Sequence, residues 1–439
     1  MSVAGRSFFM FRQPVARLFV AIVLFACMWF YVQHILIPHQ QQEATVTGRP
    51  RGMLSDLYPR WLGARELLLH HRDPYGPDVT REIQAGYYGR PLDPARPRDP
   101  KDQQAFAYPV FVVFLLAPTV KLPFEEIKPV FTWFLVFLTA ATVPLWLRTV
   151  GWRVSRFDQL AMIVLTLGSF QVAQGLKLQQ LSLAVSALLA TAVALATAGQ
   201  LLTAGAFLAL ALIKPQLSFP LLAWLLVWAS ADLKNRWRLV VGFAVAATLL
   251  VAGAEIVLPG WIGRFQHAVI AYRQYTGGAE SLPEMLLGPF AGRLVIVFLI
   301  LACAVLGWLF RKKWQGSQEF FLLTALVLAV TVVIVPMVAL YNQVLLIPAV
   351  LVLVQSRDKL RLAGRLTRSI ALLTLLWGIW PWIATGLLAI VSVALKTPTL
   401  VKLWFLPLHS TLTLPILVTA MMLMKIFDVM RCSKTAEES

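Results

Sequence analysis

Asp56 is the side chain in this sequence that is best placed to act as a chemical base. It follows the first long apolar segment and lies near the start of a polar stretch, SDLYPRWLGARELLLHHRDPYG, at 55–76. A carboxylate just outside a membrane could accept a proton from a hydroxyl group that arrives from water, while a lipid substrate arrives from the bilayer. The structural alternative is a helix N-cap formed by Ser55 or Asp56, since both residue types are favoured there and an acidic group suits the helix dipole.

Three cationic side chains are candidates for binding an anion such as a phosphate. Lys214 ends an apolar run and is followed at once by Pro215, which breaks a helix. Within a span a lysine is costly and usually functional, whereas at the end of a span it can extend to the membrane surface. Arg264 and His267 lie in a later polar segment, where ordinary solvated loop charges are the alternative.

Amide side chains near the ends of apolar segments are candidates for contacts with a sugar. A polar turn between two apolar segments is formed by Gln174, Lys177, Gln179 and Gln180, and we expect it to line the same outer cavity as the cationic candidates. Tyr341-Asn342-Gln343 interrupts an apolar region after Pro336. These amides could bind a sugar, or they could satisfy backbone groups that the proline leaves unpaired.

Metal and cofactor sites are not expected. Cys27, Cys303 and Cys432 are far apart and suggest neither a disulfide framework nor a metal cluster. No dinucleotide-binding, Walker A, zinc-protease or CxxC pattern occurs where it would carry meaning, which argues against cytoplasmic nucleotide chemistry. We predict no metal, although Asp56 with a second loop carboxylate could bind one.

The composition is that of a polytopic membrane protein. The 439 residues are 59% hydrophobic with a mean hydropathy of +0.72, more apolar than a soluble core requires. The net charge of +18 could suggest nucleic-acid binding. However, the Lys and Arg residues cluster at the ends of apolar segments, where the positive-inside rule accounts for them, so no nucleic-acid partner is expected.

The basic clusters predict the topology. We expect the clusters at Arg6, Arg12 and Arg17, at 148–156, 234–238, 311–313, 357–368 and 425–434 to be cytoplasmic, together with both termini. The first apolar run resembles a signal sequence but is long enough to span and lacks a clear cleavage site, so we interpret it as a retained anchor. One transmembrane domain, 1–439, is then all-α with about twelve spans, expected at 16–37, 126–147, 157–174, 179–197, 201–214, 216–232, 238–258, 291–310, 318–336, 339–355, 368–391 and 403–427.

Two long segments, 38–126 and 259–288, are expected on the outer face. In the first, an apolar stripe at helical spacing predicts a helix along the membrane surface: Leu54, Leu57, Tyr58, Trp61 and Leu68. Asp56, Arg60 and Gly63 fall on another stripe, expected to be exposed. The stretch 108–118 is too short to span and predicts an interfacial or re-entrant helix, while 90–104 is expected to form a mobile flap or surface loop.

Four motifs in a fixed order resemble a known family. The first has an Asp soon after the first span, then an aromatic residue, Ala-Arg, Leu-Leu and Asp-Pro-Tyr, here Asp56, Trp61, Ala64-Arg65, Leu67-Leu68 and Asp73-Pro74-Tyr75. The others are Phe106 with Tyr108-Pro109 and Leu122-Pro123-Phe124, Gln174-Gly175 with Gln179-Gln180-Leu181, and Leu212-Ile213-Lys214-Pro215. This order resembles glycosyltransferase family 87, the polyprenyl-phosphate-sugar-dependent enzymes of the GT-C fold.

The resemblance implies an inverting hexosyltransferase, with mannose the expected sugar and Asp56 the catalytic base. The donor would be a polyprenyl-phosphate sugar and the acceptor a lipid or glycan, at the outer face of the bacterial cytoplasmic membrane. Family members often carry a His near the outer end of a late span, where this chain has Tyr341-Asn342-Gln343, so Lys214, Arg264 or His267 would bind the donor phosphate instead. The Gln-rich turn also lacks the family's Asn. Substrate contacts are expected from Arg60, Trp61, Arg65, Tyr108, Gln174, Lys214, Arg264, His267, Tyr341, Asn342 and Gln343.

A transporter or lipid flippase is the main alternative. It predicts repeated halves, broken helices at matching positions and ionisable groups near the membrane midplane, none of which is clear in the sequence. A non-catalytic scaffold is a third interpretation, and it predicts that Asp56 can be replaced without consequence.

Overall fold

The computed structural model describes residues 13–48, 50, 52–93, 95–275, 278, 280–336, 338–362, 364–394 and 397–438. All regular elements among these residues are helices. Arg6 and Arg12 of the first expected basic cluster lie outside the described residues. The chain begins with α2 (Pro14–Tyr31), which continues through a π-helical turn, η1 (Val32–Leu36), into α3 (Ile37–Thr47), so the expected anchor is one long helix.

Within the part of the chain that the structure describes, five helices are long and apolar enough to cross a membrane: Pro14–Thr47, α7 (Phe124–Val150), α13 (Leu233–Val257), α16 (Pro289–Phe310) and α20 (Arg365–Val391). A sixth crossing results if α8 (Arg156–Leu167) and α9 (Phe170–Lys177), which are bent by 58° at their break, form one span. The protein is therefore a multi-pass membrane protein, while the expected number of about twelve spans is not confirmed.

Most of the other expected spans coincide with shorter helices. These are α10 (Leu181–Thr197), α11 with η3 (Leu201–Ile213), α12 (Pro215–Ser230), α17 (Gln318–Ile334) and η4 with α18 (Leu340–Gln355). At 1.5 Å per residue each is shorter than a hydrocarbon layer of about 30 Å. The last expected span begins later, because α22 (Leu414–Glu438) follows turns and the short 3₁₀ helix η5 (Leu406–Leu408).

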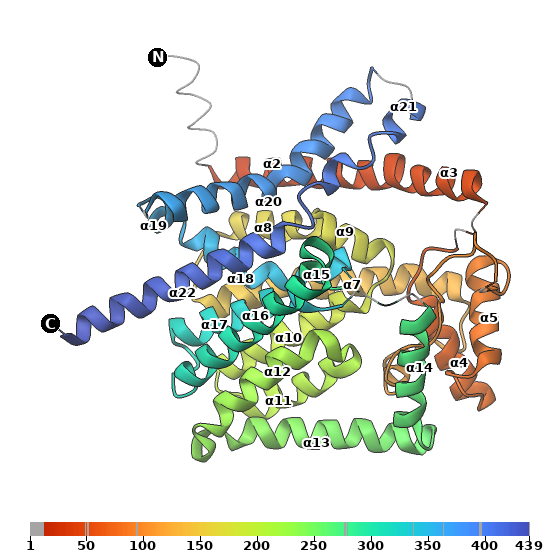
Figure 1. Cartoon of the computed structure of the whole chain (residues 1–439), viewed down its shortest axis with the longest axis horizontal. Helices are drawn as coiled ribbons and strands as arrows, with labels where there is room; N and C mark the ends of the chain where they lie inside the picture. The colour runs from red at the N-terminus through yellow and green to blue at the C-terminus, as the bar shows by residue number, and fades with distance from the viewer. Residues whose placement is uncertain are drawn as a thin grey trace.

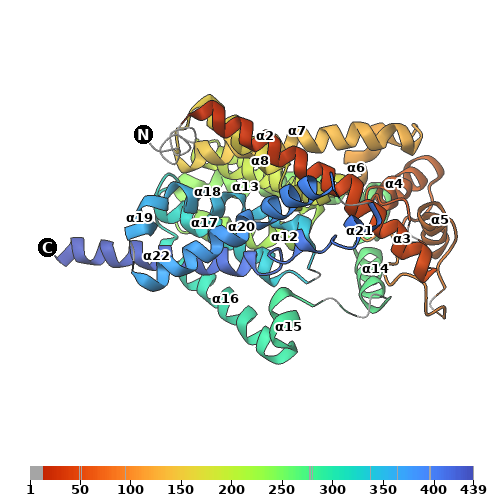
Figure 2. The same cartoon turned by 90° about the horizontal axis from the view of Figure 1, so that it is seen from above.

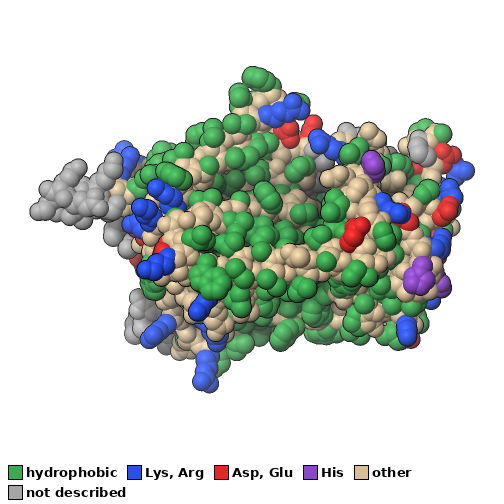
Figure 3. Space-filling view, turned by 90° about the horizontal axis from the view of Figure 1, so that it is seen from below, with side chains coloured by type: hydrophobic (Ala, Val, Ile, Leu, Met, Phe, Trp, Pro, Cys, Tyr) green, Lys and Arg blue, Asp and Glu red, His purple; other side chains and the backbone are tan. Residues whose placement is uncertain are grey.

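The core lies around α10 and α17, whose residues are largely buried. In contrast, α13, α16 and α20 expose many apolar side chains, as expected for helices that face lipid. In the space-filling view a broad apolar face runs between two ends of the molecule (Figure 3). Lys and Arg side chains gather at one end, and acidic, basic and His side chains mix at the other.

The basic clusters are tied together at one end. Arg17 forms an ion pair with Asp158 at 2.7 Å. Arg236 donates to the carbonyl oxygens of Trp228, Arg311 and Lys313 at 2.7, 2.9 and 3.0 Å. The first contact joins Arg17 to α8, just after the 148–156 cluster, and the others join the 234–238 and 311–313 clusters.

The polar first loop lies at the opposite end. Figure 1 shows α4 (Tyr58–His70), α5 (Pro77–Tyr88) and α14 (Trp261–Tyr275) side by side, away from the C-terminal end of α22, and Figure 2 shows the same arrangement from above. Phe124, at the start of α7, packs against Tyr58 and Trp61 of α4. The 27 residues of α7 extend over about 40 Å from there to the basic residue Arg148 near its other end.

Two expectations for the first loop hold only in part. Leu57 and Trp61 do not lie on the membrane surface, because they are buried in the protein core, with Trp61 only 4% exposed. The face that carries Asp56, Arg60 and Gly63 is only partly exposed: Asp56 and Arg60 are half-buried, and a Cβ atom on Gly63 would lie 2.3 Å from Phe106 Cδ2. The segment after Tyr108 is short, as expected, with α6 (Val112–Leu116) and η2 (Ala117–Thr119), but α6 is mostly buried.

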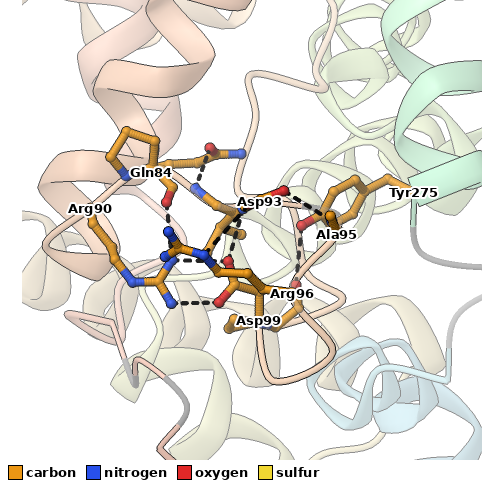
Figure 4. A network of polar contacts seen from close by, with 10 residues as sticks. Gln84, Arg90, Asp93, Ala95, Arg96, Asp99 and Tyr275 are labelled. Carbon is orange, nitrogen blue, oxygen red and sulfur yellow. Dashed lines mark hydrogen bonds and ion pairs between the residues drawn. The ribbon is translucent and has the colours of Figure 1, made fainter.

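The 90–104 segment is an ordered surface loop rather than a free flap (Figure 4). Asp99 accepts hydrogen bonds from Arg90 Nη1 at 2.9 Å and from the Asp93 backbone N–H at 2.8 Å. The Arg90 guanidinium lowers the pKa of Asp99 to about 2. Gln84 of α5 donates to Gln103 O, and Tyr275 of α14 donates to Pro100 O, so both neighbouring helices hold the loop.

Candidate active site

The Asp56 carboxylate does not cap a helix. The N-cap position of α4 is Leu57, and no side chain caps this helix. Instead, the Asp56 carboxylate accepts a hydrogen bond from Gln180 Nε2, and its backbone N–H donates to Leu178 O at 2.8 Å. The N-cap alternative is therefore wrong, and the carboxylate faces the turn between α9 and α10.

A chain of polar contacts continues from Gln180 into the protein. Lys214 Nζ donates to Gln180 Oε1 at 3.1 Å and to Ser182 Oγ at 2.6 Å. Ser182 in turn donates to Asn342 Oδ1 at 2.7 Å. Lys214 is only 6% exposed, so it does not extend to the membrane surface. These contacts bring together the residues before α4, the start of α10, η4, and the break between η3 and α12.

Aromatic rings surround the two cations of this cluster. The Arg60 guanidinium lies over the Tyr108 ring, 4.5 Å from its centre, and Arg60 also donates to Asp56 O. The Lys214 ammonium lies 5.0 Å from the centre of the Tyr341 ring. Cation–π contacts of this kind stabilise a positive charge that is largely removed from water.

The environment of Asp56 favours proton uptake. Burial raises the pKa of Asp56. The charges of Arg60 and Lys214 lower this pKa, whereas the charge of Asp102 raises it further. Asp102 reaches the cluster from the 90–104 loop and accepts a hydrogen bond from Tyr272 of α14 at 3.0 Å. A carboxylate whose pKa is raised towards the working pH is suited to take a proton from a hydroxyl group.

Six expected site residues meet in this cluster, hereafter the Asp56 cluster: Asp56, Arg60, Tyr108, Lys214, Tyr341 and Asn342. The family motif Asp73-Pro74-Tyr75 supports it from outside, since the Tyr75 hydroxyl donates to Tyr108 O at 2.6 Å. Asp73 closes the turn after α4 by accepting from the Tyr75 N–H at 2.9 Å.

The other expected site residues lie elsewhere. Trp61 is a core residue whose indole donates to Thr119 O, and Arg65 stacks on its ring. Arg264 forms an ion pair with Asp73 at 2.6 Å. His267 is exposed on α14, and Gln174 is half-buried on α9.

Gln343 has a structural position next to the Asp56 cluster. Its amide nitrogen donates to Thr411 O at 2.6 Å, and its amide oxygen accepts from Gln171 at 3.0 Å. It therefore connects α9, η4 and the segment before α22, and it shares no hydrogen bond with Asp56 among the described residues.

Three residues next to the Asp56 cluster were not expected from the sequence: Ser182, Asp102 and Tyr272. Gln180 was expected to line the outer cavity as part of the Gln-rich turn, although only Gln174 of that turn was expected to contact substrate. Ser182 follows two residues later and, like Gln180, is a polar residue at the start of an apolar run. Asp102 and Tyr272 are 170 residues apart, and no local pattern links them.

The sequence model of glycosyltransferase family 87 matches residues 106–338. The chain belongs to glycosyltransferase family 87. This membrane glycosyltransferase has Tyr108 and Lys214 of its Asp56 cluster within the matched region, together with Gln180, whereas Asp56 lies well before that region and Tyr341 shortly after it. No curated protein and no solved structure matches the chain.

Proposed function

We propose that this glycosyltransferase moves a hexose, with mannose the expected sugar, from a polyprenyl-phosphate donor to a hydroxyl group of a lipid or glycan acceptor. The reaction takes place at the outer face of the bacterial cytoplasmic membrane, with Asp56 as general base. The observation that carries the proposal is the half-buried Asp56 carboxylate, which is linked through Gln180 to the Lys214 ammonium and lies four residues before Arg60.

The chemistry is a single displacement. The acceptor oxygen attacks the anomeric carbon, the bond from that carbon to the phosphate oxygen breaks, and polyprenyl phosphate leaves. Asp56 takes the acceptor proton as the new bond forms. Because the attack is on the side opposite the leaving phosphate, the anomeric configuration inverts. The positive charges of Arg60 and Lys214 stabilise the negative charge that develops on the departing phosphate.

The position of the Asp56 cluster supports the outer face. The cluster lies at the α4 end of α7, and the basic residue Arg148 lies near the other end. The positive-inside rule favours a cytoplasmic basic end, and this supports an outer-face position for Asp56. Nucleotide sugars are cytoplasmic, so a site on that side needs a sugar that is already activated on a lipid.

Transfer in proteoliposomes tests this proposal. The protein is supplied with a radiolabelled polyprenyl-phosphate hexose or, in a parallel sample, with the same hexose as a nucleotide sugar, together with a membrane extract as acceptor. We expect label in a new glycosidic product from the lipid donor alone. Label that crosses the bilayer without a new bond would instead support a flippase, and transfer from the nucleotide sugar would refute the proposed donor.

A further inference from the structure

The orientation of the Gln180 amide is fixed by chemistry. Its nitrogen donates to Asp56 Oδ2, and its oxygen accepts from Lys214 Nζ at 3.1 Å. A carboxylate can only accept and an ammonium can only donate, so a flipped amide would lose both contacts. The side chain is 2% exposed, which makes it a buried bridge between a negative and a positive group.

The backbone of the same turn also holds Asp56. The Gln180 N–H donates to Gly175 O at 2.8 Å, and Gln180 is the N-cap residue of α10. Two residues earlier, Leu178 O accepts the Asp56 backbone N–H at 2.8 Å. The turn at 178–180 therefore holds Asp56 through two hydrogen bonds, one with its backbone N–H and one with its carboxylate.

Lys214 is held for this contact rather than left free. Besides Gln180, its ammonium donates to Ser182 Oγ at 2.6 Å and lies over the Tyr341 ring. A buried lysine with these partners keeps its position, and it keeps the Gln180 amide polarised towards Asp56.

We propose that Gln180 is the positioning residue of the Asp56 cluster: its amide couples the Lys214 ammonium to Asp56 Oδ2 and leaves Oδ1 for the acceptor proton. Among the described residues Oδ1 has no hydrogen-bond donor. The inference rests on the proposed role of Asp56 as base. Gln180 touches the base and not the reacting atoms, so its effect is on the orientation and proton affinity of Asp56.

Several titratable or charged groups face Asp56 from the surrounding elements: Arg60 of α4, Tyr88 of α5, Asp102 of the 90–104 loop, Lys214, Tyr272 of α14 and Tyr341 of η4. The Gln180 hydrogen bond lowers the pKa of Asp56 and so opposes the increase that burial and Asp102 cause. Hydrogen bonds to charged groups are strong enough that losing this one should raise the protonation midpoint of Asp56 by about one to two pH units.

Carbodiimide labelling measures this midpoint without any activity assay. A hydrophobic carbodiimide reacts with a protonated buried carboxyl group, and mass spectrometry of the peptide that contains Asp56 gives the labelled fraction as a function of pH. The full-length protein in proteoliposomes is compared with Gln180→Leu and Gln179→Leu. Gln179 is the control because it is also a buried amide of the same turn, and its nitrogen donates to Leu176 O and Thr132 Oγ1 instead.

We expect the labelling midpoint to rise by about one to two pH units in Gln180→Leu and to stay unchanged in Gln179→Leu. An unchanged midpoint in Gln180→Leu, or an equal rise in both variants, overturns the inference. If Gln180→Leu does not fold, Gln180→Glu replaces it, because a Glu can still accept from Lys214 but its carboxylate cannot donate to Asp56. A midpoint at or below the wild-type value in that variant would also refute the coupling.

Transfer kinetics on the same samples separate this inference from the proposed function. With the lipid-linked donor, Gln180→Leu should lose about 10- to 100-fold in kcat below the wild-type midpoint and recover at higher pH, with little change in KM. If no protein transfers sugar but the labelling midpoint still shifts, the coupling stands and the proposed function fails. If the wild type transfers sugar and Gln180→Leu matches its kcat at every pH, the positioning role is refuted.

Discussion

At the scale of single residues, Asp56 has an arrangement that favours reactivity over stability. Burial raises its pKa, so Asp56 binds a proton more readily in the folded protein than in the unfolded chain. Among the described residues its carboxylate receives a hydrogen bond from the amide of Gln180 but no direct ion pair. A carboxylate kept only to stabilise the fold would be expected to have a cationic or backbone partner, as Asp99 has in Arg90.

This arrangement predicts the effect of Asp56→Asn on stability. Because the folded-state pKa lies above the unfolded value, ionised Asp56 destabilises the fold as pH rises through the folded pKa. We expect Asp56→Asn to unfold at the same or a higher temperature than the wild type at neutral pH, with the difference vanishing below the unfolded pKa. Thermal unfolding in detergent over a pH series measures this, and a less stable Asn variant at neutral pH would indicate a structural role for the carboxylate.

The sequence identifies the site residues that stand out against an apolar background. Asp56, Lys214 and Asn342 are each polar at the edge of an apolar run, and this signal needs no knowledge of the fold. Asp102 and Tyr272 could not be found in this way, since each lies in an ordinary polar segment and acquires its role through a contact across 170 residues.

At the scale of elements, α4 shows how a correct periodicity can lead to a wrong environment. The apolar stripe of this helix exists as expected, but it packs on Phe124 and the protein core rather than on lipid. Periodicity reports that one face is apolar and does not report what covers it. The close approach at Gly63 shows that part of the opposite face is covered as well.

The approach of Phe106 to Gly63 can be tested by substitution. Gly63→Ala should lower the unfolding temperature, because Phe106 is fully buried and cannot move away, and overpacking of this kind costs about 1–3 kcal/mol. Gly386→Ala in α20 is the control, as no atom lies within 4 Å of its Cβ position. If the two variants unfold alike, α4 is not packed against Phe106 as described.

Arg236 is the second element-scale test, because it fastens the start of α13 to the turn between α16 and α17. Its guanidinium donates hydrogen bonds to three backbone carbonyl oxygens and lies 4.0 Å from the centre of the Trp228 ring. We expect Arg236→Leu to destabilise the protein by about 2–4 kcal/mol, with Arg236→Lys restoring only part, since an ammonium lacks the planar fork. Chemical unfolding followed by Trp fluorescence measures the loss, and wild-type stability in both variants would contradict the role.

At the scale of the whole molecule, the two ends differ in the way that the topology predicted from the sequence requires. The sequence located most helices and both polar ends, because basic clusters and apolar runs are local signals. It did not fix the number of crossings, since breaks at Gly168 and at Lys214-Pro215 leave helices shorter than a bilayer. Whether a short helix completes a span depends on its partners.

Cysteine labelling tests which end faces outward. In a protein with its natural cysteines replaced, Arg81→Cys in exposed α5 should react with an impermeant thiol reagent in intact cells. Lys234→Cys at the basic end should react only after the cells are permeabilised. The reverse pattern would place Asp56 in the cytoplasm, where a lipid-linked donor would no longer be required.

The central claim is that Asp56 takes the acceptor proton, and single-turnover transfer from a radiolabelled polyprenyl-phosphate hexose tests it most directly. Asp56→Asn should lose about 10²- to 10⁴-fold in the rate of bond formation while still binding the donor. Glu66→Gln, which alters a buried carboxylate of α4 that is paired with Arg72, should retain the wild-type rate. Equal rates for the wild type and Asp56→Asn would contradict the account.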